Sequence, residues 1–220
     1  TKLAQQLGTK KLKAFYENAG YGKKTGIELP GELPGKVTFN YESELANASF
    51  GQGMTTTPIQ NLQALSSIAN NGTVLKPYIV DKIVDGNGKI VYQGKRTELN
   101  TIASKDTIDE VKKLMYDVVY NGLSSSKAFA ADNVTVIGKT GTAQIASPTG
   151  GYLTGNYDYI KSFAGLFPYE DPEYVIYFSV KQLIGETRDM ANVISDAIEE
   201  IAKYKNLVET SSDIDETKIM

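Results

Sequence analysis

The sequence of 220 residues contains no histidine, no cysteine and no tryptophan. Without histidine, a Ser-His-Asp or Cys-His catalytic centre cannot form within the chain. The usual zinc sites need histidine or cysteine and are excluded as well, and the absence of cysteine also rules out disulfides and thiol chemistry. Any chemistry carried by these residues must therefore use serine or threonine hydroxyls, lysine, tyrosine or carboxylates.

The net charge is also small: the sequence has 23 basic and 26 acidic residues, which gives −3. No strong electrostatic field favours nucleic acid or an acidic membrane surface. The purely apolar runs, such as residues 174–178, are too short to span a bilayer. The chain does not start with methionine and opens with no signal peptide, so we expect an internal piece of a longer protein.

Apolar residues at helical spacing predict four helical segments. These are residues 3–19 with a break at Gly8, residues 58–69, a segment that starts at Ser104 or Thr107 and ends at Gly122, and residues 188–204. The second has the clearest start, because Thr57 can cap it, Pro58 suits its first position and Gln60 completes a capping box.

Strand signals dominate the second half of the chain. We expect a hairpin of residues 78–84 and 89–92, strands at 134–144, 159–167 and 173–182 with the last covered on both faces, and Gly-bearing loops at 22–35 and 47–53. Sequential strands with short turns favour an antiparallel sheet. The expected fold class is therefore α+β, a layered α/β sandwich in which helices flank the sheet.

One segment combines charge, hydroxyls and glycine on a predicted strand. Lys139, Thr140, Gly141 and Thr142 follow the apolar run 134–137. Thr140 and Thr142 are two residues apart, so both project to one face and can hold a carboxylate together. The ammonium of Lys139 attracts anions, and a strand glycine permits close approach of another backbone. The plain alternative is an exposed strand with lysine and threonine on its wet face.

This segment resembles the third motif of the penicillin-binding proteins, the serine DD-transpeptidases that crosslink peptidoglycan. Other segments support the resemblance in the order that the family shows, and they favour its class B members. They are residues 3–8, 26–31, 50–53, 57–60, 68–72, 75–77, 162–168 and 171–174. The resemblance covers about residues 1–204.

The resemblance implies the fold shared by penicillin-binding proteins and serine β-lactamases, incomplete at its N-terminus. Residues 1–204 would be the C-terminal part of a transpeptidase domain, and residues 205–220 a polar, flexible tail. The parent protein would crosslink stem peptides that end in D-Ala-D-Ala through an acyl-serine, and β-lactams would acylate the same serine. No cofactor and no metal is implied.

The resemblance also assigns roles to individual residues. Lys139 would support the hydroxyl relay and attract the substrate carboxylate, which Thr140 and Thr142 would bind. The backbone N–H of Thr142 would belong to the oxyanion hole. Gly141 would keep the strand open to substrate, and Phe50 and Gln52 would line the cleft. An equally simple interpretation makes Phe50 and Gln52 part of a tight structural turn.

Two family motifs, Ser-x-x-Lys and Ser-x-Asn, should precede the segment at which this chain begins. We therefore expect the nucleophilic serine and its base lysine outside these 220 residues, and a fragment that is inactive alone. Ser124 and Lys127 match Ser-x-x-Lys formally. They stand in the wrong order, in what we expect to be a polar loop, so we interpret the match as accidental.

Several alternatives remain open at this point. A DD-carboxypeptidase or a serine β-lactamase shares the fold and the third motif, and a non-catalytic recognition or assembly module would explain the missing nucleophile. Family membership would place the parent protein at the extracytoplasmic face of the cell membrane, with an anchor in the missing N-terminal region. Its expected partners are a cell-wall glycosyltransferase and division or elongation proteins, and the truncated chain is expected to expose apolar surface and self-associate.

Smaller candidates complete the survey. Asp189 or Thr187 near the start of the last helix is interpreted as a cap rather than an acid. The aspartates do not form a recognisable metal loop; they are Asp81, Asp85, Asp106 and Asp109.

Overall fold

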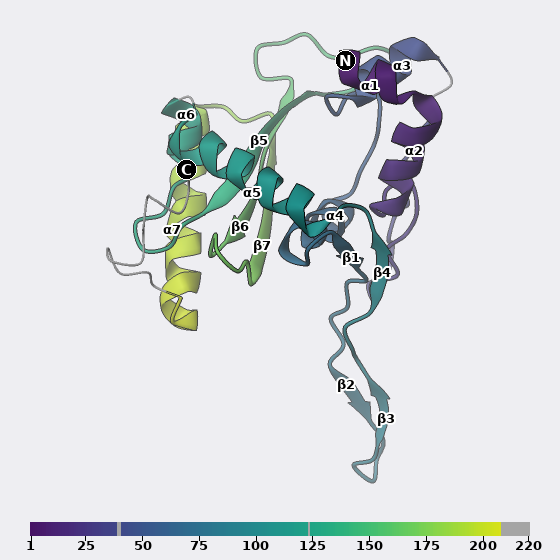
Figure 1. Cartoon of the computed structure of the whole chain (residues 1–220), viewed down its shortest axis with the longest axis vertical. Helices are drawn as coiled ribbons and strands as arrows, with labels where there is room; N and C mark the ends of the chain where they lie inside the picture. The colour runs from purple at the N-terminus through teal and green to yellow at the C-terminus, as the bar shows by residue number, and fades with distance from the viewer. Residues whose placement is uncertain (39–40, 123, 208–220) are drawn as a thin grey trace. The chain divides into compact units, whose positions relative to one another are not determined.

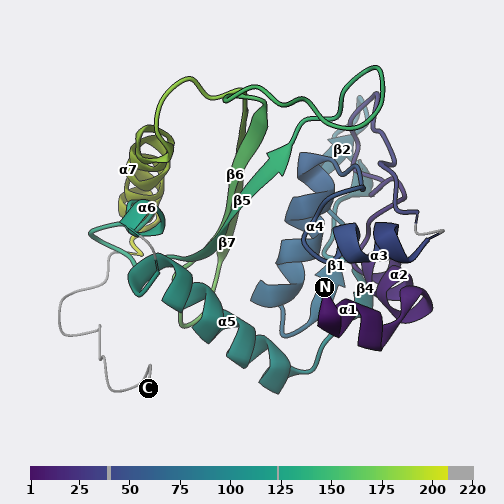
Figure 2. The ribbon, with the colours of Figure 1, turned by 90° about the horizontal axis from the view of Figure 1, so that it is seen from above.

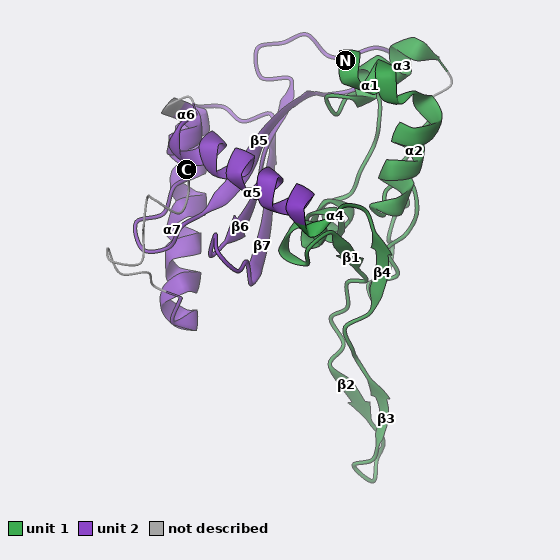
Figure 3. Cartoon of the chain, viewed as in Figure 1, with its two compact units in different colours: residues 1–105 green, residues 106–220 purple. Residues whose placement is uncertain are grey.

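The computed structural model describes residues 1–38, 41–122 and 124–207. The chain divides into two compact units, residues 1–105 and residues 106–220, which Figure 3 shows in different colours. Each unit is described by itself. Together they contain helices and antiparallel sheets, as the α+β prediction required.

Unit 1 opens with two short helices, α1 (Lys2–Leu7) and α2 (Thr9–Asn18). Gly8 separates them with a φ of 82°, so the predicted break is confirmed. Their apolar residues are not deeply buried, because Leu3 is 81% exposed and no residue of α2 is buried. The spacing thus located the helices but not a core.

A third helix, α3 (Glu42–Ala48), was not predicted, and it takes in the first two residues of the expected loop at 47–53. Its last residue, Ala48, is fully buried, and it shares a small core with Val37, Leu12 and Tyr16. The Tyr16 hydroxyl donates to the Ala48 carbonyl over 2.8 Å. This contact joins α3 to α2.

Helix α4 (Pro58–Ala69) begins as predicted. The Gln60 N–H donates to the Thr57 hydroxyl, and the Thr57 N–H donates back to the Gln60 side-chain oxygen over 3.0 Å. Its apolar spacing predicts a buried face of Ile59, Leu62, Leu65, Ile68 and Ala69. This prediction is wrong, because these residues are only partly buried and the buried residues are polar: Gln60, Gln63 and Ser67. The Gln60 amide donates to the carbonyls of Lys23 and Pro34, and these bonds fix the Gly/Pro-rich loop on the helix.

Two small antiparallel sheets complete unit 1. Strand β1 (Thr73–Leu75) pairs with β4 (Glu98–Thr101), and neither was predicted. Strands β2 (Lys82–Val84) and β3 (Ile90–Gln93) form the predicted hairpin, shorter than expected, which projects from unit 1 in Figure 1. Every residue of β2 and β3 is exposed. The Glu28 carboxylate holds the base of the hairpin, because it accepts the Ile79 N–H and the Tyr92 hydroxyl, each over 3.1 Å.

Unit 2 is a three-stranded antiparallel sheet in the order β5-β6-β7, with helix α7 against one face (Figure 2). Its elements are α5 (Lys105–Tyr120), α6 (Ser124–Lys127), β5 (Ile137–Gln144), β6 (Tyr159–Phe167), β7 (Tyr174–Lys181) and α7 (Thr187–Lys205). The three predicted strands and both long helices are confirmed. Residues 174–178 of β7 are all partly buried, so both faces of this part of the strand are partly covered, whereas Ser179 and Lys181 are exposed.

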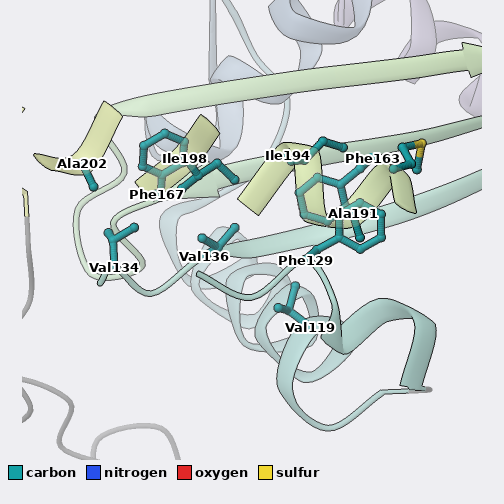
Figure 4. Packing of buried hydrophobic residues seen from close by; sticks show 11 residues of the cluster. Val119, Phe129, Val134, Val136, Phe163, Phe167, Ala191, Ile194, Ile198 and Ala202 are labelled. Atoms are coloured by element: carbon teal, nitrogen blue, oxygen red, sulfur yellow. The ribbon is translucent and has the colours of Figure 1, made fainter. Parts of the chain in front are cut away.

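The core of unit 2 lies between α7 and the sheet (Figure 4). The rings of Phe129 and Phe163 stack with their centroids 4.1 Å apart. Ile194 and Ile198 of α7 are buried against this cluster, whereas Val193 is 60% exposed although its helical spacing fits the same apolar stripe. Helix α7 extends to Lys205, whereas most of the expected tail, residues 208–220, lies outside the described residues.

Among the described residues, no helix combines the length and the apolarity needed to cross a membrane.

Candidate active site

Strand β5 carries the lysine–threonine motif at the point where the strand leaves the core. Ile137 and Gly138 are buried, Lys139 and Thr142 are exposed, and Thr140 and Gly141 lie between these extremes. The apolar segment that precedes the motif therefore anchors the strand, and the motif itself reaches solvent. In the sheet order β5-β6-β7, β5 is an edge strand.

The hydrogen-bond pattern fixes which way the backbone of the motif points. The Ile145 N–H donates to the Asp158 carbonyl over 3.1 Å, so these residues form a hydrogen-bonded pair of the β5–β6 ladder. In an antiparallel ladder such pairs alternate with pairs that exchange no bonds. The register then makes Gly141–Ser162 and Ala143–Ile160 hydrogen-bonded pairs.

A second observation supports this assignment. The Gln182 N–H donates to the Tyr159 carbonyl over 2.9 Å, at the matching position of the β6–β7 ladder. Odd-numbered residues of β6 therefore bond to β7 and even-numbered ones to β5, which agrees with the pattern derived from Ile145.

The motif consequently presents free backbone groups at the edge of the sheet. Thr140 and Thr142 stand in the non-bonded pairs, so their N–H and C=O groups point away from β6. The Lys139 ammonium donates to the Thr140 carbonyl over 2.8 Å, which places this cation at the same edge. One strand edge thus combines two backbone N–H donors with a positive charge.

The side chains of the motif divide between the two faces of the sheet. Thr140 is opposite Phe163 and Thr142 is opposite Lys161, so both threonines lie on the face that packs against α7. Lys139 and Gly141 lie on the other face. The expected common face of the two threonines follows from the same alternation.

The structure supplies a packing reason for Gly141. A Cβ at this position would meet the Ser162 hydroxyl at 2.5 Å, closer than real Cβ contacts. The glycine therefore admits the side chain of its cross-strand neighbour. Its expected role toward substrate remains a prediction.

Phe50 and Gln52 belong to unit 1 and follow α3 in a tight turn. Both of their N–H groups donate to the Asn47 carbonyl, over 3.2 and 3.0 Å, and Gly51 between them has a φ of 87°. The Phe50 side chain is 63% exposed. This geometry explains the segment as a turn, and its place beside Lys139 remains a prediction.

The expected polar loop at Ser124–Lys127 is wrong, because these residues form the one-turn helix α6. The loop prediction failed because four residues are too few to show a helical period. Lys127 is exposed to solvent, and so is Ser125.

The start of α7 confirms a capping role for Asp189, whose carboxylate accepts the Glu186 N–H over 3.0 Å. Thr187 is instead the first helical residue, and its hydroxyl accepts the Lys161 ammonium over 2.9 Å. Within the described ranges, no group of three or more acidic side chains is placed to hold a metal ion.

Lys161 was not predicted as a site residue. It became a candidate only through the register, which sets it directly across from Thr142. The connection of residues 145–158 separates the two strands in the sequence. An alternating pattern in β6 is visible in the sequence, but its alignment with β5 is not.

Comparison with known proteins shows the family to which the chain belongs. The family model of the penicillin binding protein transpeptidase domain matches residues 1–198. The chain is 33% identical to stage V sporulation protein D of Bacillus subtilis over 98% of the chain and 35% of that protein. It is 36% identical to a peptidoglycan D,D-transpeptidase FtsI homolog of Mesostigma viride over 62% of the chain and 24% of that protein.

Solved structures give the same fold. Penicillin binding protein 2X of Streptococcus thermophilus superposes with a TM-score of 0.83 at 28% identity, over 90% of this chain and 30% of that one. Penicillin binding protein 3 of Mycobacterium tuberculosis superposes with a TM-score of 0.85 over 95% of this chain and 49% of that one. Its identity is 24%, so this likeness concerns the fold.

The chain belongs to the penicillin-binding protein transpeptidase family. Its relatives include a stage V sporulation protein and a peptidoglycan D,D-transpeptidase homolog, and its fold is that of penicillin-binding protein transpeptidase domains. It spans about a third of the length of stage V sporulation protein D and about a quarter of the FtsI homolog.

Proposed function

We propose that this chain forms the β5 wall of the active site in a serine-type D,D-transpeptidase that crosslinks peptidoglycan. The observation that carries the proposal is the free edge of β5, where the N–H groups of Thr140 and Thr142 and the ammonium of Lys139 converge. Acyl transfer to and from a serine needs donors for a developing oxyanion, and this edge has them in rigid positions.

The edge also suits a peptide substrate. An extended stem peptide can add to an open strand edge through main-chain hydrogen bonds. Its acyl carbonyl would then receive the Thr142 N–H, and its terminal carboxylate the hydroxyls of Thr140 and Thr142. Lys139 adds positive charge at the same edge, where it attracts the anionic peptide and supports proton transfer by neighbouring hydroxyls.

We place the nucleophile outside these 220 residues. Ser124 and Lys127 form the only Ser-x-x-Lys match in the sequence. A base lysine is activated when it is withdrawn from water, and Lys127 is exposed. We therefore do not assign the pair a role in acylation, and we expect the isolated chain to be inactive.

The test uses the full-length protein that contains this chain and a fluorescent penicillin. We expect one acylated serine outside the 220 residues, mapped by mass spectrometry of tryptic peptides. Lys139→Met should slow acylation at least about a hundredfold, since the loss of one electrostatic contact in such sites costs this much. Lys181→Met, in β7 of the same sheet, is the matched control and should not change the rate.

Two results would contradict the proposal. Acylation of Ser124 would place the nucleophile in this chain, and an unchanged rate in Lys139→Met would remove the β5 wall from the chemistry. Release of product by water rather than by an amine acceptor would convert the assignment to a D,D-carboxypeptidase or a β-lactamase, both of which use the same acyl-serine.

Family membership also supports our proposals for the cellular location and the protein partners of the parent protein. We place the parent protein at the extracytoplasmic face of the cell membrane, held by an anchor outside this chain. There it would act with a cell-wall glycosyltransferase and with division or elongation proteins. Crosslinking in cells with fractionated membranes tests both statements, and recovery of the parent protein only in the cytoplasm would overturn them.

We further propose that the isolated 220 residues self-associate. Both edge strands of the sheet in unit 2 offer backbone donors and acceptors, and open edges pair with other chains. Light scattering should show species larger than a monomer. A monodisperse monomer at high concentration would overturn this expectation.

A further inference from the structure

Two adjoining hollows in unit 2 meet at Lys161. The larger, about 550 Å³, is lined by Ser125, Lys161 and the first turn of α7 with the residues just before it. The smaller, about 130 Å³, is lined by Lys161, Leu183 and the end of the β5–β6 connection. Among the residues that the structure describes, Lys161 is the one positively charged side chain that lines both.

The register links this hollow to the proposed substrate edge. Lys161 and Thr142 form a pair without ladder bonds, so their side chains share a face and their Cβ atoms stand about 5 Å apart. Thr142 is exposed there. The hollow therefore continues the face on which the threonine hydroxyls lie.

The charges around the larger hollow favour an anion. Two cations, Lys161 and Arg188, and one carboxylate, Glu186, line it, so its net charge is +1. In the part of the chain that the structure describes, neither cation forms an ion pair.

The Lys161 ammonium is positioned by one hydrogen bond and keeps further donors for a ligand. It is half-buried, and it donates one hydrogen bond to the Thr187 hydroxyl over 2.9 Å. An ammonium has three donors, so two remain for a ligand. The bond to Thr187 orients the side chain along the hollow, beside the start of α7.

We propose that Lys161, assisted by Arg188, binds the terminal carboxylate of the stem peptide on the same face of the sheet as the Thr140 and Thr142 hydroxyls. The threonine hydroxyls supply neutral hydrogen bonds, and Lys161 adds a charge-assisted bond to the carboxylate beside the general attraction exerted by Lys139. This inference rests on the proposed function and adds a specificity-determining residue to it.

The experiment compares two substrates of the full-length protein. One is an acyl-D-alanyl thioester whose leaving group ends in a free carboxylate, and the other is its carboxamide twin. Lys161→Met keeps the apolar stem and removes the charge, so it should lower the ratio of the two acylation rates about tenfold, as expected for loss of a charge-assisted bond. Lys161→Arg should keep most of the ratio.

The control is Lys181→Met, the same change on the opposite face of the sheet, since Lys181 pairs with Ile160. It should leave both rates unchanged. A purely structural role for Lys161 would lower both rates of Lys161→Met equally, together with the thermal midpoint, and would overturn the inference.

The outcomes separate the two proposals. If neither substrate acylates the wild-type protein, the proposed function is wrong and the inference falls with it. If the wild-type protein prefers the carboxylate and Lys161→Met keeps the same preference, the proposed function stands and Lys161 has no part in recognising the anion.

Discussion

The orientation of the Thr142 N–H can be tested by removing that one atom group. Thr142→Pro deletes the N–H, and the register indicates that β6 does not use it. Proline is tolerated on an edge strand when its missing N–H faces away from the ladder. The change should therefore leave the stability of the sheet nearly intact.

The same change should strongly reduce acylation. Loss of one oxyanion-hole donor costs about 2.7–4 kcal/mol, a factor of about 100 to 1,000 in rate. The assay is the rate of acylation by a fluorescent penicillin over a range of concentrations, measured on the full-length protein. The loss should appear in the acylation step, because a proline ring that merely blocked the edge would weaken binding instead.

Two matched variants complete the design. Thr142→Val removes the hydroxyl but keeps the N–H, so it reports the side chain separately. Ala143→Pro deletes an N–H that points toward β6, and it should lower the free energy of unfolding by at least about 1 kcal/mol through the lost ladder bond. If Thr142→Pro destabilises the protein as much as Ala143→Pro does, the register argument is refuted. If Thr142→Pro and Thr142→Val acylate at equal rates, the oxyanion assignment is refuted.

Three further expectations concern stability. Gly141→Ala should cost less than about 1 kcal/mol in urea unfolding, because the new Cβ would meet the end of the Ser162 side chain, which can rotate away. A loss in the range of about 1–3 kcal/mol, typical of overpacking against a fixed group, would show that Ser162 cannot move. The hydrogen bond from the Ile79 N–H is the largest cause that lowers the pKa of Glu28 below its ordinary 4.5. The wild-type protein should therefore have a higher thermal midpoint than Glu28→Ala above pH 4.5, and this difference should vanish as the pH falls through the lowered pKa. If the difference between the two thermal midpoints grew as the pH fell, the prediction would be contradicted. Phe129→Ala should cost about 3–5 kcal/mol by calorimetry, because the ring is fully buried and stacked; a loss under 1 kcal/mol would contradict the packing.

The long elements of the fold were predictable because their patterns repeat. Helix α7 and strand β6 have enough residues for a period to be recognised, and both were predicted within a residue or so of their observed bounds. Helix α3 and strands β1 and β4 were not predicted, because each is too short for a repeating pattern of apolar residues to be recognised. Their formation depends on contacts made by the rest of unit 1.

Burial was harder to predict than secondary structure. In α4 the sequence favours an apolar face, yet Gln60 is completely buried because two loop carbonyls need its amide donors. The sequence does not show that need, since the loop lies more than twenty residues away.

The candidate site divides in the same manner. The common face of Thr140 and Thr142 follows from strand alternation and could be read from the sequence. The free direction of the Thr142 N–H and the pairing with Lys161 depend on the register between two strands. The alternation within each strand does not fix how the two strands align, so this pairing required the structure.

The β2–β3 hairpin has a dynamic consequence. All of its strand residues are exposed, so few buried contacts oppose its local opening, and segments of this kind open at a fraction of the global free energy of unfolding. Glu28 is the main tie at its base. The arm should therefore exchange its amide hydrogens and admit proteases first, while the remainder of unit 1 stays folded.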